Sequence, residues 1–251
     1  MTDRPKTTLR DCIYGLAVGD ALGIPYEFMP RGTFECTDMT GYGTHEQPAG
    51  TWSDDTSMTL ATCDSIRELG HIDTADMSDK FVSWIARGEY TIDGVFDYGG
   101  TTARALHTGK GGSGERDNGN GSLMRIAPLA FVDATDDEIC EVSAITHAHR
   151  TSTDACVIFV ELMRSVMNGT LPSWVLQLKD VPDRKSGQVA SCATRLRQPP
   201  GASSTLAATK IACLPPSTWA TTPTPPQPSP ARHTVSRPSR WSGSTSCAVK
   251  S

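Results

Sequence analysis

The sequence contains no long apolar segment. Among its 251 residues, the longest purely apolar run covers positions 155–160. A membrane-spanning helix needs about 20 apolar residues, so we expect no membrane partner. No apolar stretch follows the first six residues, so we also expect no secretory signal. The eight cysteines include no CxxC pair, which argues against a zinc ribbon or a disulfide scaffold and favours the reducing cytoplasm.

Acidic residues are absent from positions 188–251, so all 28 lie in residues 1–187. The first part carries a formal charge of −12 and the second part +7, for a total of −5. A negative chain gives no reason to expect a nucleic-acid partner. Ten of the 17 prolines also fall within residues 188–251. We therefore expect a helical but incomplete domain over 1–187 and an irregular or disordered tail over 188–251.

The first part shows the apolar periodicity of helices. A capping box at Thr135–Glu138 precedes apolar residues at helical spacing. Further apolar stripes cover residues 9–16, 77–85 and 158–166, and the last two are followed by glycines. No run alternates apolar and polar residues with period two. The sequence predicts a compact all-α, multi-helix domain with long loops.

The segment Trp52–Thr56 could carry chemistry. Ser53 would cap a helix, and Asp54 and Asp55 would suit the positive end of its dipole. The same oxygen donors also suit a hard cation such as Mg²⁺ or Mn²⁺. Adjacent side chains on a helix diverge by about 100°, so the two aspartates would more naturally hold two neighbouring ions than chelate one. Both interpretations stay open for this segment alone.

A glycine-rich stretch precedes it. Gly15, Gly19 and Gly23 lie on one face of a helix, which indicates either close helix packing or a backbone that approaches a ligand. In the second case, Asp20 and Glu27 would project towards that ligand.

Residues 117–125 read DNGNGSLMR. Such a loop before a possible helix can present N–H groups to phosphates, although no strand precedes it and it is not a Walker A loop. A simple turn is the alternative.

The segment Thr146–His149 contains two histidines. On a helix, His147 and His149 would point about 200° apart and could not chelate one ion. One of them would therefore be buried, and at most one would contact a ligand.

The order of these segments resembles the ADP-ribosylglycohydrolase family over about residues 9–170. The matching stretches are GLAVGDALGIPYEF, WSDDTSM, FDYGGTTARAL, DNGNGSLMRIAPL and THAHR. The resemblance implies an all-α fold with a binuclear Mg²⁺ or Mn²⁺ site at the base of a cleft. It also implies hydrolysis of the glycosidic bond that joins ADP-ribose to a protein side chain or a related acceptor.

The resemblance also implies roles for individual residues. Ser53, Asp54 and Asp55 match the first half of the family's metal site. Glu27 and Asp117 match carboxylates at the metals and near the scissile ribose, and either could shuttle the proton. The substrate-binding residues implied are Asn120, Gly121, Ser122 and His147. The partner would be an ADP-ribosylated protein or a small ADP-ribose conjugate, and we expect a monomer in the cytoplasm.

The family completes its metal site with a C-terminal Asp-Asp-Thr-Asp-Thr motif, which this sequence lacks. When residues 217–231 are read one base out of frame, with suitable third bases, they can encode NLGDDTDTTAAIAG, and two further stretches give family-like sequence in that frame. We interpret the tail as the product of a one-base slip near Gly187 that impairs the enzyme. A natural Pro/Thr-rich linker is the alternative. A non-catalytic ADP-ribose-binding or structural relative is the alternative function.

Overall fold

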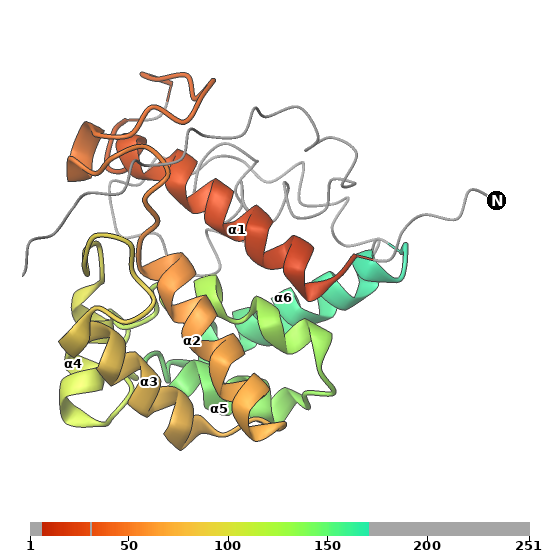
Figure 1. The fold of residues 1–251 in the computed structure, drawn as a ribbon. Coiled ribbons are helices and arrows are strands. Elements are labelled where there is room, and N and C mark those ends of the chain that lie inside the picture. Colours follow the sequence, from red (N-terminus) through yellow and green to blue (C-terminus); the bar gives the residue numbers. More distant parts are fainter. Residues whose placement is uncertain (1–6, 31, 171–251) are drawn as a thin grey trace, which may run out of the picture. The chain divides into compact units, whose positions relative to one another are not determined.

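The computed structural model describes residues 7–30 and 32–170, and within these ranges the chain is helical (Figure 1). The six α-helices are α1 (Leu9–Gly23), α2 (Asp54–Leu69), α3 (Thr74–Arg87), α4 (Gly100–Thr108), α5 (Asp136–Ala144) and α6 (Arg150–Met167). The four short 3₁₀ helices are η1 (Ile24–Tyr26), η2 (Gly43–His45), η3 (Leu123–Arg125) and η4 (Ala127–Phe131). No strand occurs in these ranges; the bridges Tyr42–Gln47 and Gly112–His147 are isolated. The all-α prediction is confirmed.

Local sequence signals set the helix ends. The capping box at Thr135 and Glu138 forms as predicted at the start of α5. A second capping box, at Thr8 and Asp11, starts α1. Gly70, which follows α2, has a φ of 73°, a left-handed conformation that costs glycine little and other residues more.

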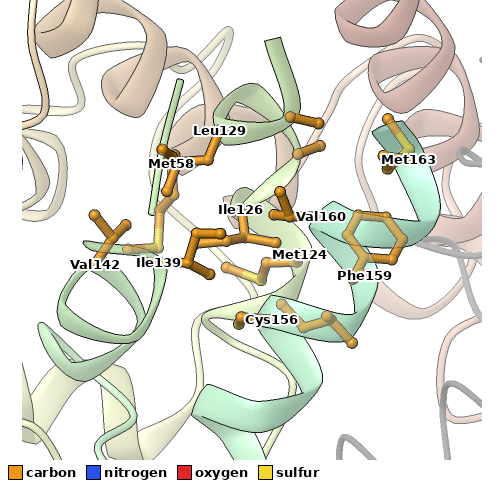
Figure 2. Packing of buried hydrophobic residues seen from close by; sticks show 14 of the residues in the cluster. Met58, Met124, Ile126, Leu129, Ile139, Val142, Cys156, Phe159, Val160 and Met163 are labelled. Atoms are coloured by element: carbon orange, nitrogen blue, oxygen red, sulfur yellow. The ribbon is translucent and has the colours of Figure 1, made fainter. Parts of the chain in front are cut away.

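Helix α2 is the central element, because it packs against α1, α3, η3 and η4. Figure 2 shows the core beside it, where Met58 of α2 lies near Leu129 of η4. The α5 residues Ile139 and Val142 are both fully buried in this core. Helix α6 contributes four labelled side chains: Cys156, Phe159, Val160 and Met163. The core therefore links α5 and α6 to α2. The first turn of α2 carries Asp54 and Asp55.

The possible helix after the glycine-rich loop is the three-residue 3₁₀ helix η3. The boundary near residue 187, the tail over 188–251 and the frame slip lie outside the described residues. In the described ranges, no helix has the length and apolar character that crossing a bilayer requires.

Candidate functional site

The start of α2 is fixed by Asp20 of α1. The backbone N–H groups of Ser53 and Thr56 donate to Asp20 Oδ2 over 3.0 and 3.1 Å. The Ser53 hydroxyl donates to Oδ1 over 2.7 Å, and the Thr56 hydroxyl donates to Oδ2 over 2.6 Å. Asp20 is only 1% exposed. One buried carboxylate from a different helix therefore caps α2.

This arrangement changes two expectations. Ser53 occupies the N-cap position, but its side chain makes no capping hydrogen bond within α2, because its hydroxyl donates to Asp20. Asp20 projects into the start of α2 rather than towards a ligand. Gly15 and Gly19 are buried on α1, in keeping with the close-packing interpretation of the glycine face.

Asp54 and Asp55 form the first turn of α2 and are 6% and 7% exposed. Burial raises the pKa of Asp54 well above its usual value, and the negative charges of Asp55 and Asp97 raise it further. Two neighbouring buried carboxylates repel each other unless protons or a cation neutralise them. The helix N-terminus supplies only part of that compensation.

Glu27, His45 and Asp97 converge beside this turn. His45 Nε2 lies 2.8 Å from Glu27 Oε2 and 3.6 Å from Asp97 Oδ1. Potential ligand atoms of the three residues all lie within 4.8 Å of one another. The His45 ring lies 5.9 Å from the Phe28 ring and 5.5 Å from the Phe96 ring, centroid to centroid. These two aromatic contacts restrict the orientation of the imidazole.

The backbone is strained at the same place. Phe28 and Asp97 have φ values of 60° and 56°, in the left-handed region that non-glycine residues rarely adopt. Asp97 is itself one of the three converging residues, and Phe28 directly follows Glu27. Such strain concentrates at functional sites, where the surrounding structure over-determines the geometry.

We call Asp20, Glu27, Asp54, Asp55 and Asp97 the acidic cluster. Burial, followed by the hydrogen bond and charge of Asp97, raises the pKa of Glu27 to about 10. Glu27 is therefore protonated at neutral pH when no cation is present. Divalent cations lower the pKa of such carboxyls by supplying the missing positive charge.

The donor set of the acidic cluster fits a hard cation. Glu27, Asp54, Asp55 and Asp97 offer carboxylate oxygens, which Mg²⁺ and Mn²⁺ prefer. His45 adds one nitrogen donor, Nε2, which contacts Glu27. No cysteine belongs to it, so a structural zinc site of the thiolate type is a poor match.

Asp117 belongs to a second group of residues, at the start of the glycine-rich loop. Its carboxylate accepts hydrogen bonds from Thr101 Oγ1 over 3.2 Å and from the Gly114 N–H over 3.1 Å, and it forms an ion pair with Arg104. The Gly114 N–H contributes most to lowering its pKa, and Thr101 and Arg104 add to the effect. Asp117 is therefore ionised at neutral pH.

The glycine-rich loop packs against His147. A Cβ atom on Gly121 would lie 2.6 Å from His147 Cε1 and 3.0 Å from Thr102 Oγ1, so only glycine fits there. A Cβ atom on Gly119 would lie 3.5 Å from His147 Nε2, an ordinary contact. Asn120 accepts a backbone hydrogen bond from Met124 over 3.0 Å, which closes the loop onto η3. The loop, α4 and His147 therefore form one unit.

The side chain of Ser122 points inward. It is fully buried and lies 2.9 Å from Ser143 Oγ and 3.5 Å from Cys156 Sγ. A ligand in the loop would therefore meet the backbone of Ser122 rather than its hydroxyl.

His147 and His149 do not share a helix, so that part of the prediction is wrong. His147 is 3% exposed and lies in the connection between α5 and α6. Its flanking residues pair with Gly112: the Gly112 N–H donates to Thr146 O over 2.9 Å, and the Ala148 N–H donates to Gly112 O over 2.7 Å. His149 instead caps α6 by accepting from the Thr151 N–H. One histidine is buried, as expected, and it is the one that faces the loop.

The structure brings the predicted site residues together in two groups. Glu27, Asp54 and Asp55 meet in the acidic cluster, with Ser53 beside them. Asp117, Asn120, Gly121, Ser122 and His147 meet around the loop. The segment 97–102 contributes to both groups, because Asp97 joins the acidic cluster and Thr102 contacts Gly121.

Sequence reasoning missed His45 and Asp97. Asp97 is the second residue of the FDYGG segment that carried the family resemblance, so an acid before a glycine pair and a helix was an available signal. His45 has no comparable local signal. It is identified only by its 2.8 Å contact with Glu27, from which it is separated by 18 positions in the sequence.

Comparison with known proteins agrees with this architecture. The chain matches the sequence model of the ADP-ribosylglycohydrolase family over residues 1–244. An ADP-ribosylarginine hydrolase Tri1 of Pseudomonas putida (strain GB-1) is 35% identical over 180 residues, which are 66% of this chain and 47% of that protein. The ADP-ribosyl-[dinitrogen reductase] glycohydrolase of Rhodospirillum rubrum is 31% identical over 167 residues, which are 62% of this chain and 56% of that protein.

A solved structure, an ADP-ribosylglycohydrolase-related protein complex, shares the fold. It superposes with a TM-score of 0.60 at 24% identity and covers 81% of this chain and 79% of its own. The chain spans about half the length of the curated relatives that it matches. Fold and site together define an all-helical protein with a buried carboxylate centre beside a glycine-rich loop. The chain belongs to the ADP-ribosylglycohydrolase family.

Proposed function

We propose that this chain is a metal-dependent hydrolase that cleaves the glycosidic bond between ADP-ribose and a protein side chain or a related small acceptor. The observation that carries this proposal is the acidic cluster. Five carboxyl groups meet at the start of α2. Burial raises the pKa values of Asp20, Glu27 and Asp54, and repulsion from neighbouring carboxylates adds to the effect at Glu27 and Asp54. Such a group is costly without cations and is what a cation site of oxygen donors requires.

Ser53, Asp54 and Asp55 are proposed to hold the metal, with Glu27 close to it. When bound, two divalent cations, Mg²⁺ or Mn²⁺, supply the charge that orients ribose hydroxyls and activates a water molecule.

A carboxylate must also move the proton. Glu27 lies in the acidic cluster, where its environment favours the protonated form. Asp117 is ionised, but its oxygens accept from Thr101, Arg104 and Gly114. Glu27 is the better placed of the two to exchange a proton. If Glu27→Gln and Asp117→Asn both leave turnover intact, neither residue is the catalytic carboxylate.

The glycine-rich loop is proposed to bind the ribose and diphosphate. The Asn120 side chain and the backbone of Gly121 and Ser122 would contact the ligand, with His147 behind them. Glycine at position 121 allows the backbone to approach the histidine closely. Backbone N–H groups in such a loop suit phosphate oxygens.

The test is release of ADP-ribose from ADP-ribosylated arginine by the full chain, with Mg²⁺ or Mn²⁺ and after chelation with EDTA. We expect slow turnover that requires metal, because the sequence lacks the second acidic motif. The same chain with its tail restored in the displaced reading frame is expected to be faster. Turnover that survives EDTA would contradict the proposal.

A second candidate function is non-catalytic binding of ADP-ribose, or a structural role. The absence of the Asp-Asp-Thr-Asp-Thr motif from this sequence favours it. It predicts tight ADP-ribose binding without turnover, even in the chain with the restored frame. Sequencing the source DNA around codon 187 tests the frame slip independently of either function.

We further propose that the protein is a monomer in the cytoplasm. Within the described ranges, Cys36, Cys63, Cys140 and Cys156 form no disulfide, which is compatible with a reducing compartment. Analytical ultracentrifugation of the full chain tests the oligomeric state, and a dimer at micromolar concentration would contradict it.

A further inference from the structure

Arg125 is a buried cation behind the glycine-rich loop. Its side chain is 0% exposed, and its guanidinium carbon lies 4.6 Å from the centre of the Phe81 ring. Its Nη2 donates to the Val142 carbonyl over 3.1 Å and to Thr146 Oγ1 over 3.0 Å. Its Nε and Nη1 have no hydrogen-bond partner in the described part of the chain. Burying a charge with so few hydrogen-bond partners is costly. We therefore ask what its one side-chain hydrogen bond, to Thr146, does.

Thr146 connects this arginine to His147. Thr146 Oγ1 lies 2.9 Å from His147 Nδ1, and both residues are buried. Arginine can only donate, so Thr146 Oγ1 accepts from Arg125 and keeps its own proton to donate. Within the described ranges, the only other hydrogen-bond partner of that hydroxyl is His147 Nδ1.

The position of the proton on His147 follows from this chain of hydrogen bonds. If His147 carried its proton on Nδ1, two donors would face Thr146 Oγ1, and the buried threonine proton would have no acceptor. If Nδ1 is unprotonated, it accepts from Thr146, and the threonine hydroxyl then both accepts and donates a hydrogen bond. Burial and then the charge of Arg125 lower the pKa of His147 to about 4, so the ring is neutral and has one proton to place.

The protonated nitrogen is then Nε2, which faces the glycine-rich loop. The Cβ positions built on Gly119 and Gly121 would lie 3.5 and 3.3 Å from Nε2. The two glycines leave the imidazole edge next to bare backbone. A ligand against that backbone would meet an N–H donor and not an acceptor.

We propose that Arg125, acting through Thr146, is a positioning residue that holds His147 as the Nε2–H tautomer, so that His147 donates a hydrogen bond to an acceptor oxygen of a ligand in the glycine-rich loop. The inference rests on the proposed function for the identity of that ligand, a phosphate or ribose oxygen of ADP-ribose. It excludes a general-base role for His147, because the nitrogen that faces the ligand carries the proton.

The test is the ring ¹⁵N spectrum of the histidines in the full ¹⁵N-labelled chain at neutral pH, which separates the two neutral tautomers. His147→Gln assigns the His147 signals. We expect an Nε2–H pattern in the unsubstituted chain and in Thr146→Ser, which keeps the hydroxyl. Thr146→Val should lose that pattern or mix the tautomers. Thr153→Val is the matched control, because that hydroxyl donates to the Arg150 carbonyl on α6.

An Nδ1–H pattern in the unsubstituted chain would overturn the inference without any variant. Retention of the Nε2–H pattern in Thr146→Val would also overturn it. Titration with ADP-ribose then separates this inference from the proposed function. We expect Thr146→Val to weaken binding roughly tenfold and Thr146→Ser to leave it unchanged. If the chain with the expected tautomer does not bind ADP-ribose, the proposed function fails; if Thr146→Val binds as tightly as the unsubstituted chain, the tautomer inference fails.

Discussion

Replacing Asp20 with alanine should loosen the start of α2. The two hydroxyls that donate to Asp20 can rotate to other acceptors, but the N–H groups of Ser53 and Thr56 are fixed by the backbone and buried. Each buried N–H left unpaired costs about 1–3 kcal/mol, so the loss should be roughly 2–6 kcal/mol. Removing a carboxylate whose pKa is raised by burial offsets part of that loss. We therefore expect a decrease of about 2–4 kcal/mol in the free energy of unfolding.

Urea unfolding of the full chain, followed by circular dichroism, measures this effect. Asp11→Asn is the control on the same helix, because Asp11 forms an exposed capping box with Thr8 and should contribute only about 1 kcal/mol or less. Unfolding with excess Mn²⁺ adds a second readout, since a displaced first turn would misplace Asp54 and Asp55. An Asp20→Ala chain within about 0.5 kcal/mol of the unsubstituted protein would refute the reasoning.

Three further predictions address charge, close packing and the core. In EDTA, the free energy of unfolding should fall as pH rises from about 4.5 to about 10, because folded Glu27 keeps a proton that the unfolded chain releases in this window. Urea titrations at pH 6 and pH 9 measure this, and Mn²⁺ should reduce the difference. Gly121→Ala should destabilise the fold by about 1–3 kcal/mol and weaken ADP-ribose binding in calorimetry, because the new methyl group would collide with His147. Arg164→Met should lower the free energy of urea unfolding by about 1–3 kcal/mol, because Arg164 donates to three backbone carbonyls around the end of η4.

Each of these predictions has a matched control. Glu27→Gln should reduce the pH dependence without abolishing it, because burial also raises the pKa values of Asp20 and Asp54. An unchanged slope in that variant would assign the whole effect to other groups. Gly119→Ala should be tolerated, because its Cβ would make only an ordinary contact. Arg150→Met should have little effect, because the Arg150 side chain is 89% exposed. Equal losses in Arg150→Met and Arg164→Met would contradict the structural role of Arg164.

Local signals were enough to predict most of the fold. The Thr135 capping box and the glycines after α2 and α3 mark helix ends because they act on backbone groups within one turn. Helix α4 was not predicted, since its nine residues begin with glycine and threonine and include few apolar side chains. The type and length of η3 stayed open in the sequence, because a glycine-rich loop can lead into either an α-helix or a 3₁₀ helix.

The site could be predicted only as separate segments. Asp54 and Asp55 stood out because they are adjacent and precede an apolar stripe. The role of Asp20 depends on α1 packing against α2, and that contact is not encoded within either segment alone. The contact of His45 with Glu27 and Asp97 likewise requires three loops to fold together. Long-range contacts of this kind leave no spacing that sequence patterns can detect.

The buried carboxylates were more specific evidence than the motif alone. An Asp pair after serine suits a helix cap as well as a metal. In the structure, a carboxylate from another helix does the capping, and the Asp pair lies beside two further acidic side chains. The cap interpretation therefore no longer accounts for the burial of Asp54 and Asp55, whereas the proposed cation site would explain it.

Titration of the full chain with Mn²⁺, followed by electron paramagnetic resonance, tests the central claim most directly. The account predicts weak binding at the acidic cluster, because the chain carries only the first half of the family's metal-binding motifs. Asp54→Asn should abolish that binding. Asp64→Asn, later in α2, should not, because Asp64 pairs with Lys80 and Tyr90 instead of the acidic cluster. Binding that persists unchanged in Asp54→Asn, or two tightly held ions in the chain as it stands, would contradict the account.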